Sequence, residues 1–401
     1  MKWKHSRTSW GCKLRFVGMS MEKRRLGDIA SYINGYAFKP EDRGTEGLPI
    51  IRIQDLTGNA YDVGSYNGDY PSRIEINNGD VLISWSASLG VYVWNKGKAL
   101  LNQHIFKVAF DKLDVNKQYF VFAVKHKLKE MESKTHGATM KHIVKKDFDN
   151  TLIPFPSLER QAEVADILSR VESVIAAREQ EFSVLDMLIK ARFVEMFGDP
   201  VHNSLNLPTL PMTEVCEIID GDRGKNYPKQ DEFYDDEYCL FLNAKNVTSH
   251  GFDFKECMFI TKAKDKALRK GKLKRGDVVL TTRGTLGNLA FYTETIPYEN
   301  VRINSGMVIL RMNRKIIDEG FFIEQFRMQV DDIKKSVASG SAQPQLPIST
   351  MNKINVIMPD LLRQKEFTAF VAHVDKSKVV VQKALDETQL LFDNLMQQYF
   401  G

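Results

Sequence analysis

The sequence contains few cysteines and no long hydrophobic run, and each absence excludes a class of protein. The four cysteines, Cys12, Cys216, Cys239 and Cys257, form no Cys-x-x-Cys pair, so a thiolate zinc site is not expected. Free thiols are typical of a reducing compartment, which favours a cytoplasmic location. No apolar run approaches the roughly 18 residues of a transmembrane helix, and we expect no membrane association.

Motifs of several enzyme classes are also missing. The chain has no Asn-Pro-Pro-Tyr or Asp-Pro-Pro-Tyr motif for amino-methyl transfer and no Gly-x-x-x-x-Gly-Lys-[Ser/Thr] phosphate loop. It also lacks a His-Glu-x-x-His zinc motif and a Gly-x-Ser-x-Gly nucleophile elbow. The sequence therefore predicts no catalytic residue and no metal ligand, and we expect a protein that is not an enzyme.

The chain has little excess charge of either sign. The net charge is +5 and the isoelectric point is about 8.7, so binding to nucleic acid would require local positive charge or a basic partner. Residues 1–20 are basic but lack the apolar region of a signal peptide. We interpret them as an N-terminal extension, either disordered or encoded upstream of a start at Met21, and assign them no function.

What the sequence does contain is an internal duplication. The segment beginning at Gly137 aligns with the segment beginning at Gly340, at an offset of 203 residues that holds to the last residue. Identities on this offset include Gly137/Gly340, Pro156/Pro359, Leu158/Leu361, Arg160/Arg363, Gln161/Gln364, Glu163/Glu366 and Phe197-Gly198/Phe400-Gly401. Upstream, the match continues with shifting offsets, as insertions in loops would produce.

Each repeat has a globular part followed by a helical part. The globular parts, near 22–157 and 208–360, hold short apolar stretches separated by Gly, Asn, Asp and Pro, which predict short strands joined by turns. The predicted elements include strands at 49–53, 80–83 and 289–292 and helices near 118–132 and 319–336. The helical parts, 158–197 and 361–400, contain neither Pro nor Gly, which predicts two long helices.

Both long helices carry an apolar stripe at heptad spacing. Eight of ten stripe positions from Val164 to Met196 are apolar, and eight of ten from Phe367 to Tyr399. Neither helix buries such a stripe alone, so the sequence predicts that the two pair as a coiled coil. Arg178 and Lys378 interrupt the stripes near the middle, where polar residues can fix the register.

Chain connectivity predicts the orientation of this pair. The first helix leads from one globular part to the other, so a second helix that packs on the first and returns is antiparallel to it. Forty residues span about 60 Å at the rise of an α-helix. The expected fold class is α+β, with two similar α/β domains separated by a long antiparallel two-helix coiled coil and related by an internal pseudo-two-fold axis.

A pseudo-symmetric pair of diverged domains fits duplex DNA. Proteins that recognise DNA often present two similar modules to major-groove faces about 34–36 Å apart. Base edges are recognised by Arg, Lys, Asn and Gln, with Ser and Thr as adaptable partners. The candidate DNA-binding residues are Arg52, Gln54, Ser84, Ser86, Ser88, Asn102, Gln103, His104, Lys141 and His142 in the first repeat, and Arg223, Lys225, Asn243, Lys245, Asn246, Thr282, Arg283, Thr285, Asn304, Ser305 and Gln343 in the second.

Some of these features have other interpretations. His104 and His142 fit ordinary surface or partly buried histidines, and Trp85 fits a packing residue better than a wedge between bases. The strongest single pattern is Thr281–Thr285, because Arg283 follows a predicted strand and Gly284 permits close approach of the backbone. The alternative function is a coiled-coil adaptor whose two heads bind protein partners instead of DNA.

The duplicated order of motifs resembles that of the specificity subunits of type I restriction–modification systems. The local marks are Pro-Phe-Pro-Ser-Leu-Glu-Arg-Gln at 154–161, its counterpart at 357–364, and Ala-Arg-Phe-Val-Glu-Met-Phe-Gly-Asp-Pro at 191–200. The Gly-Asp-Val-Leu/Val pattern is also similar to that family's recognition domains. The resemblance covers nearly the whole chain after residue 20.

The resemblance implies a domain organisation and a set of partners. Residues 21–157 and 208–360 would be target-recognition domains, 158–197 and 361–401 spacer helices, and 198–207 a linker. The partners implied are double-stranded DNA, two methyltransferase (modification) subunits and restriction nuclease–translocase subunits. S-adenosylmethionine, ATP and Mg would be bound by those subunits, and this chain would bind no cofactor. The target would be bipartite and asymmetric, and its bases are not encoded in any simple pattern.

Overall fold

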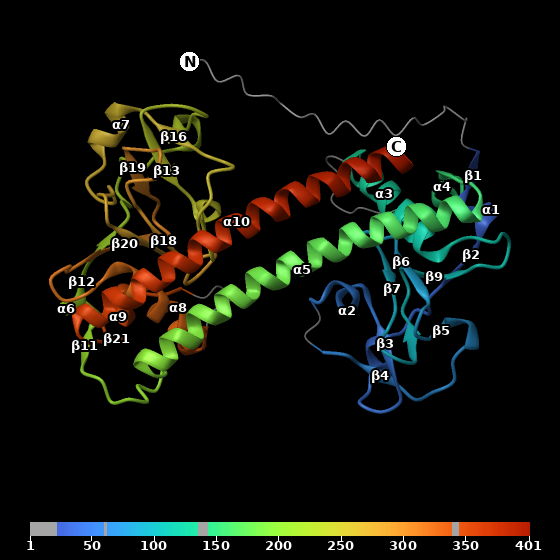
Figure 1. Ribbon diagram of the computed structural model, residues 1–401, viewed down its shortest axis with the longest axis horizontal. Helices are drawn as coiled ribbons and strands as arrows, with labels where there is room; N and C mark the ends of the chain where they lie inside the picture. The colour runs from blue at the N-terminus through green and yellow to red at the C-terminus, as the bar shows by residue number, and fades with distance from the viewer. Residues whose placement is uncertain (1–21, 60–61, 135–142, 339–344) are drawn as a thin grey trace, which may run out of the picture. The chain divides into compact units, whose positions relative to one another are not determined.

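The computed structural model describes residues 22–59, 62–134, 143–338 and 345–401 (Figure 1). The chain divides into two units, the first made of Met1–Ala177 with Ala384–Gly401 and the second of Arg178–Lys383. We call residues 22–157 the first head and residues 208–360 the second head. No helix in the described ranges combines the length and apolar character needed to cross a membrane.

The first head contains two four-stranded sheets. One has the strand order β2-β9-β6-β7 and is antiparallel throughout, and the other has the order β4-β3-β8-β5 with β3 and β8 parallel. The strands are β2 (Ser31–Asn34), β3 (Leu48–Ile51), β4 (Ser65–Tyr66), β5 (Glu75–Ile76), β6 (Val81–Ser84), β7 (Gly90–Val93), β8 (Ala99–Leu101) and β9 (Ile105–Ala109). A short ribbon pairs β1 (Lys23–Arg25) with β10 (Leu152–Pro154). The helices are α1 (Leu26–Ile29), α2 (Ile53–Thr57), α3 (Lys117–Lys134) and α4 (Lys145–Asp149).

The second head repeats this topology. Its larger sheet has the order β12-β20-β17-β18, and its second sheet, β16-β13-β19, again contains one parallel pair, β13 with β19. The strands are β11 (Thr209–Pro211), β12 (Cys216–Asp220), β13 (Cys239–Leu242), β14 (Val247–Thr248), β15 (Gly251–Phe252), β16 (Phe259–Ile260), β17 (Val278–Thr281), β18 (Leu289–Phe291), β19 (Val301–Ile303), β20 (Met307–Met312) and β21 (Asn355–Ile357). The helices are α6 (Met212–Val215), α7 (Lys262–Ala267), α8 (Glu319–Ala338) and α9 (Ile348–Met351). The duplication in the sequence is therefore a duplication of the fold.

Most predicted elements of the heads are confirmed, with one difference of detail. Helices α3 and α8 cover the two predicted helical segments, and β6 and β18 match two predicted strands to within one residue at each end. The strand predicted at 49–53 ends at Ile51, because the Asp55 carboxylate accepts hydrogen bonds from the Arg52 backbone N–H and side chain. This local bond turns the chain into α2.

The two long helices begin and end at the predicted residues. They are α5 (Leu158–Phe197) and α10 (Leu361–Phe400), of 40 residues each. All twenty predicted stripe positions are buried or half-buried, including the two interruptions at Arg178 and Lys378. Heptad spacing therefore identified the face of each helix that is covered.

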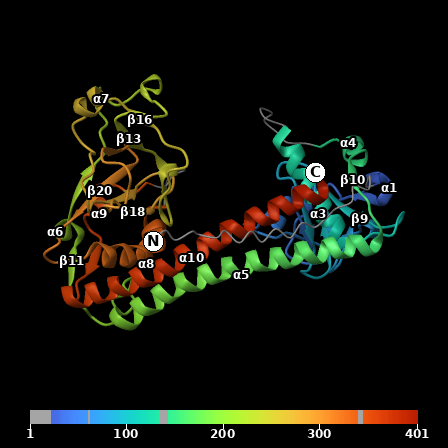
Figure 2. The same ribbon diagram turned by 45° about the horizontal axis from the view of Figure 1, so that its top comes forward.

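Contacts inside each unit confirm that the helices are antiparallel (Figures 1 and 2). In the first unit, the guanidinium of Arg160 lies 5.8 Å from the centre of the Tyr399 ring. In the second, an Arg363 guanidinium N–H donates to the Met196 carbonyl at 2.6 Å. The start of each helix thus lies against the end of the other.

A buried glutamine ties each long helix to its head. Gln161 and Gln364 are fully buried, and each side-chain amide donates to a nearby proline carbonyl, Pro156 at 2.9 Å and Pro359 at 2.8 Å. Each side-chain oxygen also accepts a hydrogen bond from the backbone N–H just before α3 or α8, at 2.9 Å in both cases. This contact explains why both copies carry the Pro-x-x-x-x-Gln spacing, since an unpaired buried amide is costly.

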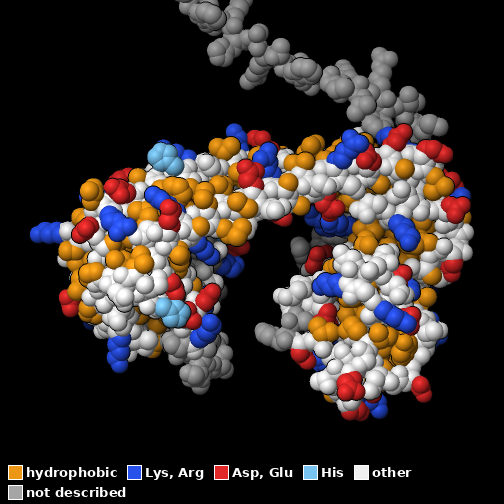
Figure 3. Space-filling model, turned by 60° about the horizontal axis from the view of Figure 1, so that its bottom comes forward, with side chains coloured by type: hydrophobic (Ala, Val, Ile, Leu, Met, Phe, Trp, Pro, Cys, Tyr) orange, Lys and Arg blue, Asp and Glu red, His pale blue; other side chains and the backbone are white. Residues whose placement is uncertain are grey.

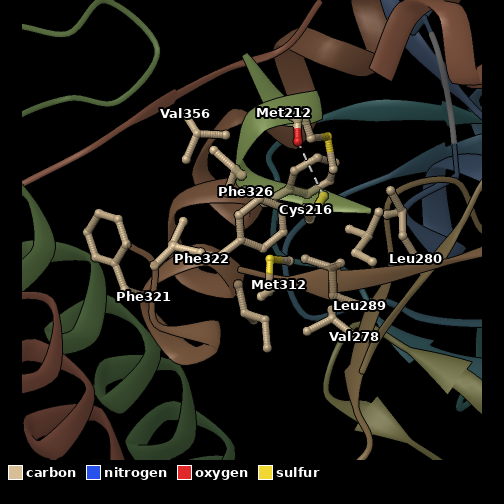
Figure 4. Close-up of a cluster of buried hydrophobic side chains, with 14 of the residues drawn as sticks. Met212, Cys216, Val278, Leu280, Leu289, Met312, Phe321, Phe322, Phe326 and Val356 are labelled. Carbon is tan, nitrogen blue, oxygen red and sulfur yellow. Dashed lines mark hydrogen bonds between the residues drawn. The ribbon is translucent and has the colours of Figure 1, made fainter. Parts of the chain in front are cut away.

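The hydrophobic core of the second unit joins the sheet to α8 and the long helices. Phe321, Phe322 and Phe326 of α8 belong to one buried cluster with Val278 and Met312 of the larger sheet (Figure 4). Phe321 lies on the far side of this cluster from the sheet and stacks on Phe193 of α5, with ring centres 5.5 Å apart. Cys216 lies in the same cluster, and burial raises the pKa of its thiol to about 12. The β12-β20-β17-β18 sheet is therefore supported on one face by helices, which leaves the loops at its ends to vary.

Candidate nucleic-acid interface

Four loops of the first head meet through backbone contacts. A Cβ atom on Gly35, just after β2, would lie 2.0 Å from the Asn102 carbonyl oxygen, so only glycine permits this approach. The Asn102 N–H donates to the Ile51 carbonyl at 3.0 Å, and the Trp85 N–H donates to the His104 carbonyl at 3.3 Å. We call residues 34–38, 52–54, 84–90 and 102–104 the first loop face.

The second head brings the matching loops together in the same way. A Cβ on Gly221 would lie 2.2 Å from the Asn304 carbonyl oxygen, and the Thr282 N–H donates to the Gly306 carbonyl at 2.8 Å. A Cβ on Gly284 would lie 3.9 Å from the Cβ of Ala244, which places the β13–β14 loop against the β17–β18 loop. We call residues 220–225, 243–246, 281–287 and 304–306, together with Arg269, which is held against residues 222 and 224, the second loop face. Most of the predicted site residues are thereby gathered on two equivalent surfaces.

Several predicted residues hold these loops in shape. The Asn246 side chain, 1% exposed, donates to the Asp253 and Glu256 carbonyls, and the Ser84 hydroxyl donates to the Ser88 carbonyl at 2.6 Å. Thr282 donates to the Gly306 carbonyl at 3.0 Å. Asn102, Asn243 and Asn304 each accept a hydrogen bond from a backbone N–H one or two residues further on. Local bonds of this kind are typical of Asn, Ser and Thr in turns.

Two predicted cations are engaged by neighbouring carboxylates. Arg52 forms an ion pair with Asp55 at 3.1 Å and another with Asp62 at 3.7 Å. The hydrogen bond with Asp55 is the largest of the effects that raise the pKa of Arg52. Lys245 pairs with Glu256 at 2.5 Å. These side chains help to fix the loops, and the carboxylates reduce the positive charge that they offer to a ligand.

Other predicted residues face solvent. Gln54, Ser88, Gln103, Lys225, Arg283 and Thr285 are exposed, and Ser86, His104 and Ser305 are half-buried. Arg223 is exposed and its guanidinium donates to Asp220 at 3.1 Å and to the Ser305 carbonyl at 3.3 Å. Lys141, His142 and Gln343 lie outside the described residues. The exposed group supplies the side chains that could contact a ligand.

The second loop face includes an arginine that the sequence reasoning missed. The backbone N–H of Arg269 donates to Asp222 at 2.7 Å, and its guanidinium lies 2.9 Å from the position of a Cβ on Gly224. Hydrogen bonds from the N–H groups of Gly224 and Arg269 help to hold the pKa of Asp222 below its usual range. The run Arg-Lys-Gly-Lys-Leu-Lys-Arg at 269–275 was the available signal, because short runs rich in Lys and Arg are typical of nucleic-acid contacts.

Three arginines thus lie on the second loop face. Arg223 contacts Ser305, Arg269 lies beside Gly224, and the Cβ of Arg283 is 3.8 Å from where a Cβ on Gly306 would lie. The first head has neutral residues at the matched positions. Counting from Gly35, which matches Gly221, Ala37 matches Arg223, and counting back from Gly79, which matches Gly276, Ser72 matches Arg269. Counting from the start of the β6–β7 loop, Ser86 matches Arg283. The second loop face is therefore cationic where the first is neutral. No cluster of three metal-ligating side chains occurs within the ranges that the structure describes.

Comparison with known proteins identifies the family. The sequence matches the type I restriction modification DNA specificity domain twice, at residues 19–185 and 209–387. It is 23% identical to the type I restriction enzyme EcoBI specificity subunit of Escherichia coli, over 94% of this chain and 84% of that protein. It is 24% identical to the type I restriction enzyme MjaVIII specificity subunit of Methanocaldococcus jannaschii, over 91% of this chain and 88% of that protein.

Solved structures show the same fold. The S subunit of a type I restriction-modification system from M. genitalium superposes with a TM-score of 0.54 at 16% identity, over 96% of this chain and 98% of that one. A chain from a type I R-M system studied for complex assembly and conformational transition superposes with a TM-score of 0.52, also at 16% identity, over 94% and 96%. The repeated heads and paired helices define the class of two-domain specificity proteins. The chain belongs to the type I restriction–modification DNA specificity family.

Proposed function

We propose that this chain is the non-catalytic DNA-recognition subunit of a type I restriction–modification complex, and that each head recognises one half of a bipartite asymmetric target. The observation that carries this function is the pair of equivalent loop faces, built by the same backbone contacts but lined by different side chains. Equivalent faces suit two DNA half-sites, and different side chains suit different bases. The alternative, an adaptor that binds only proteins, has no comparable support from the relatives.

The partners in this proposal are two methyltransferase subunits, joined in the full complex by nuclease–translocase subunits. Two exposed apolar pairs on the long helices support two copies of one partner. Met187 and Leu188 on α5 are 56% and 46% exposed, and Leu390 and Leu391 on α10, at the offset of 203 residues, are 62% and 50% exposed. Figure 3 shows hydrophobic side chains at the surface along these helices. Exposed apolar residues at matched positions indicate matched docking sites.

The experiment that tests the function is expression with its methyltransferase partner, followed by sequencing of methylated DNA. We expect methylation at one bipartite, asymmetric sequence, and binding of the assembled complex to this duplex should weaken steeply as salt rises. The purified chain alone should transfer no methyl group from S-adenosylmethionine, and S-adenosylmethionine, ATP and Mg should be needed only by the partners. Methylation by the chain alone, or assembly without salt-dependent DNA binding, would contradict the proposal.

Two matched double variants test the docking sites. Met187→Glu with Leu188→Glu, and separately Leu390→Glu with Leu391→Glu, should each reduce the methyltransferase stoichiometry from two to one, as measured by native mass spectrometry. The exposed Val174→Glu serves as a control for an added charge on the helix surface. Retention of both methyltransferase subunits in each double variant would contradict this assignment.

A further inference from the structure

The first loop face contains a feature that the second lacks, a histidine held in a strained turn. His104 has a φ of 72°, and within the described residues of the first head Ala87 is the other non-glycine residue with positive φ. This left-handed region favours glycine, and other residues adopt it at a cost. The counterpart of His104 in the second head is Gly306, because the Trp85–His104 and Thr282–Gly306 backbone bonds are equivalent.

The ring of His104 is supported from below by a column of aromatic side chains. It lies edge-on to Trp85 with the ring centres 5.0 Å apart, and Trp85 stacks on Phe106 at 5.5 Å and 23°. Phe106 in turn packs on Phe148 in the core of the unit, with ring centres 5.8 Å apart. The column fixes the orientation of the imidazole, as aromatic pairs of this geometry do.

The second head has no such column at the matched positions. Thr282 stands where the first head has Trp85, Gly306 where it has His104 and Val308 where it has Phe106. The backbone hydrogen bonds of this turn therefore form without an aromatic residue. Gly306 itself does not have a positive φ, so the second head forms this turn without a left-handed residue, and the strain at His104 is particular to the first head.

The ring also has a nitrogen available to a ligand. His104 Nδ1 is buried and has no hydrogen-bond partner among the residues that the structure describes, which leaves Nε2 as the nitrogen that a ligand could reach. The side chain as a whole is half-buried on the first loop face, next to exposed Gln103. A fixed imidazole beside an exposed amide is suited to hydrogen bonding with base edges.

We propose that His104, held by Trp85, is a specificity-determining residue of the first head that contacts a base edge of its half-site. This inference rests on the proposed function and names the residue that carries it in one head. Local strain that the fold does not need is commonly kept at functional sites. Trp85 acts as a positioning residue, because its ring is covered by the histidine and the core. In the second head, the exposed Arg283 lies next to Gly306, the counterpart of His104.

His104→Gly separates this role from a structural one. The variant relieves the left-handed turn, so the melting temperature of the assembled complex should be unchanged or raised. Binding is measured for duplexes in which each recognised base pair is replaced in turn. Selectivity should fall about tenfold or more at one or two base pairs of a single half-site and stay the same in the other, as for loss of a base contact.

Two control variants complete the test. Asn206→Gly relieves a left-handed residue of the same kind, with a φ of 52°, in the linker outside both loop faces, and should leave selectivity unchanged. Arg283→Ala should alter the other half-site. Unchanged selectivity in His104→Gly, an equal loss of binding to all duplexes, or an effect in the half-site that Arg283 affects would overturn the proposal. A wild-type complex without any bipartite selectivity would instead overturn the proposed function.

Discussion

The second loop face carries Arg223, Arg269 and Arg283, whereas the first head has neutral residues at the matched positions and an aromatic column under His104. Both faces nevertheless have the same backbone contacts, with Gly35 and Gly221 approaching the matching asparagine carbonyls. The loops are thus held by backbone hydrogen bonds and glycine, which do not depend on the exposed side chains. This separation lets the two heads keep one fold while their surface chemistry diverges.

The interiors of the heads also differ, in a way that affects stability. Arg302 of β19 is 5% exposed, and its guanidinium bonds to Asp265 at 2.5 Å and to the carbonyls of Leu268 and Lys270. The matched residue of the first head is Leu100, which is fully buried. One head therefore fills this position with an ion pair and the other with hydrocarbon.

The largest expected effect comes from breaking this ion pair. Arg302→Leu copies the first head but leaves the buried Asp265 carboxylate with Lys272 as its remaining charged partner, and should cost about 3–5 kcal/mol in the free energy of unfolding. Denaturant unfolding of the purified chain measures it. Adding Asp265→Leu to form a double variant should recover part of the loss. A single variant as stable as the wild type would show that the pair is not needed.

The same ion pair predicts that the free energy of unfolding depends on pH. Burial would raise the pKa of Asp265, but the hydrogen bonds and charges of Lys272 and Arg302 outweigh it and hold the pKa below the ordinary value. A carboxyl group whose pKa is lower in the folded protein stabilises the fold above its unfolded pKa of about 3.9. This stabilisation is lost as pH falls through the folded pKa. The stability difference between wild type and Arg302→Leu should therefore shrink below about pH 4.

The next effect concerns DNA affinity. Arg283 is exposed on the second loop face, and Arg283→Ala should weaken target binding by about 1–3 kcal/mol if it forms a bidentate base contact. Ser86→Ala, at the matched position of the first head, should have a smaller effect. Fluorescence anisotropy of the assembled complex with its duplex compares the two. Equal effects of both variants would remove the distinction between a cationic and a neutral face.

A smaller effect is expected in the paired helices. Lys378 on α10 forms an ion pair with Asp186 on α5 at 2.6 Å. The residue of α5 that matches Lys378, 203 positions earlier in the chain, is Ile175. Replacing the whole pair, Lys378→Ile with Asp186→Leu, should raise the free energy of unfolding by about 1 kcal/mol, because hydrophobic residues in place of both partners of a partly buried ion pair are often stabilising. It should also loosen the choice of register and partner helix, visible as added oligomers in size-exclusion chromatography with light scattering. A fall in stability without new oligomers would assign the pair a stabilising role only.

The smallest effect concerns the reactivity of the cysteine thiols. All three cysteines that the structure describes lie in the second head, and Cys216 and Cys239 are buried, with burial raising the pKa of each thiol to about 12. Cys257 is half-buried near the surface. A thiol reagent at pH 8 should therefore modify Cys257 far faster than the other two, as read by peptide mass spectrometry. Because these thiols belong to one head, their protection from the reagent reports on the unfolding of that head. Rapid labelling of Cys239 in the native chain would contradict its burial.

The sequence alone determined the repeat, the bounds of both long helices and their covered face. These properties follow from local signals, since absence of Pro and Gly and heptad spacing act within a few turns of one helix. The sequence also identified most of the loops that carry the candidate site, because Gly, Asn, Ser and Thr indicate turns wherever the chain folds.

Tertiary structure decided which of these loops meet and what each side chain does there. Arg269 joins the second loop face only because its backbone bonds to Asp222, 47 residues earlier in the chain. Asn246 and Ser84, chosen as DNA contacts, bond to the loops themselves, and the strain at His104 depends on the turn between β8 and β9. Such outcomes depend on strands far apart in the chain that pair with one another, and no local pattern of residue types encodes them.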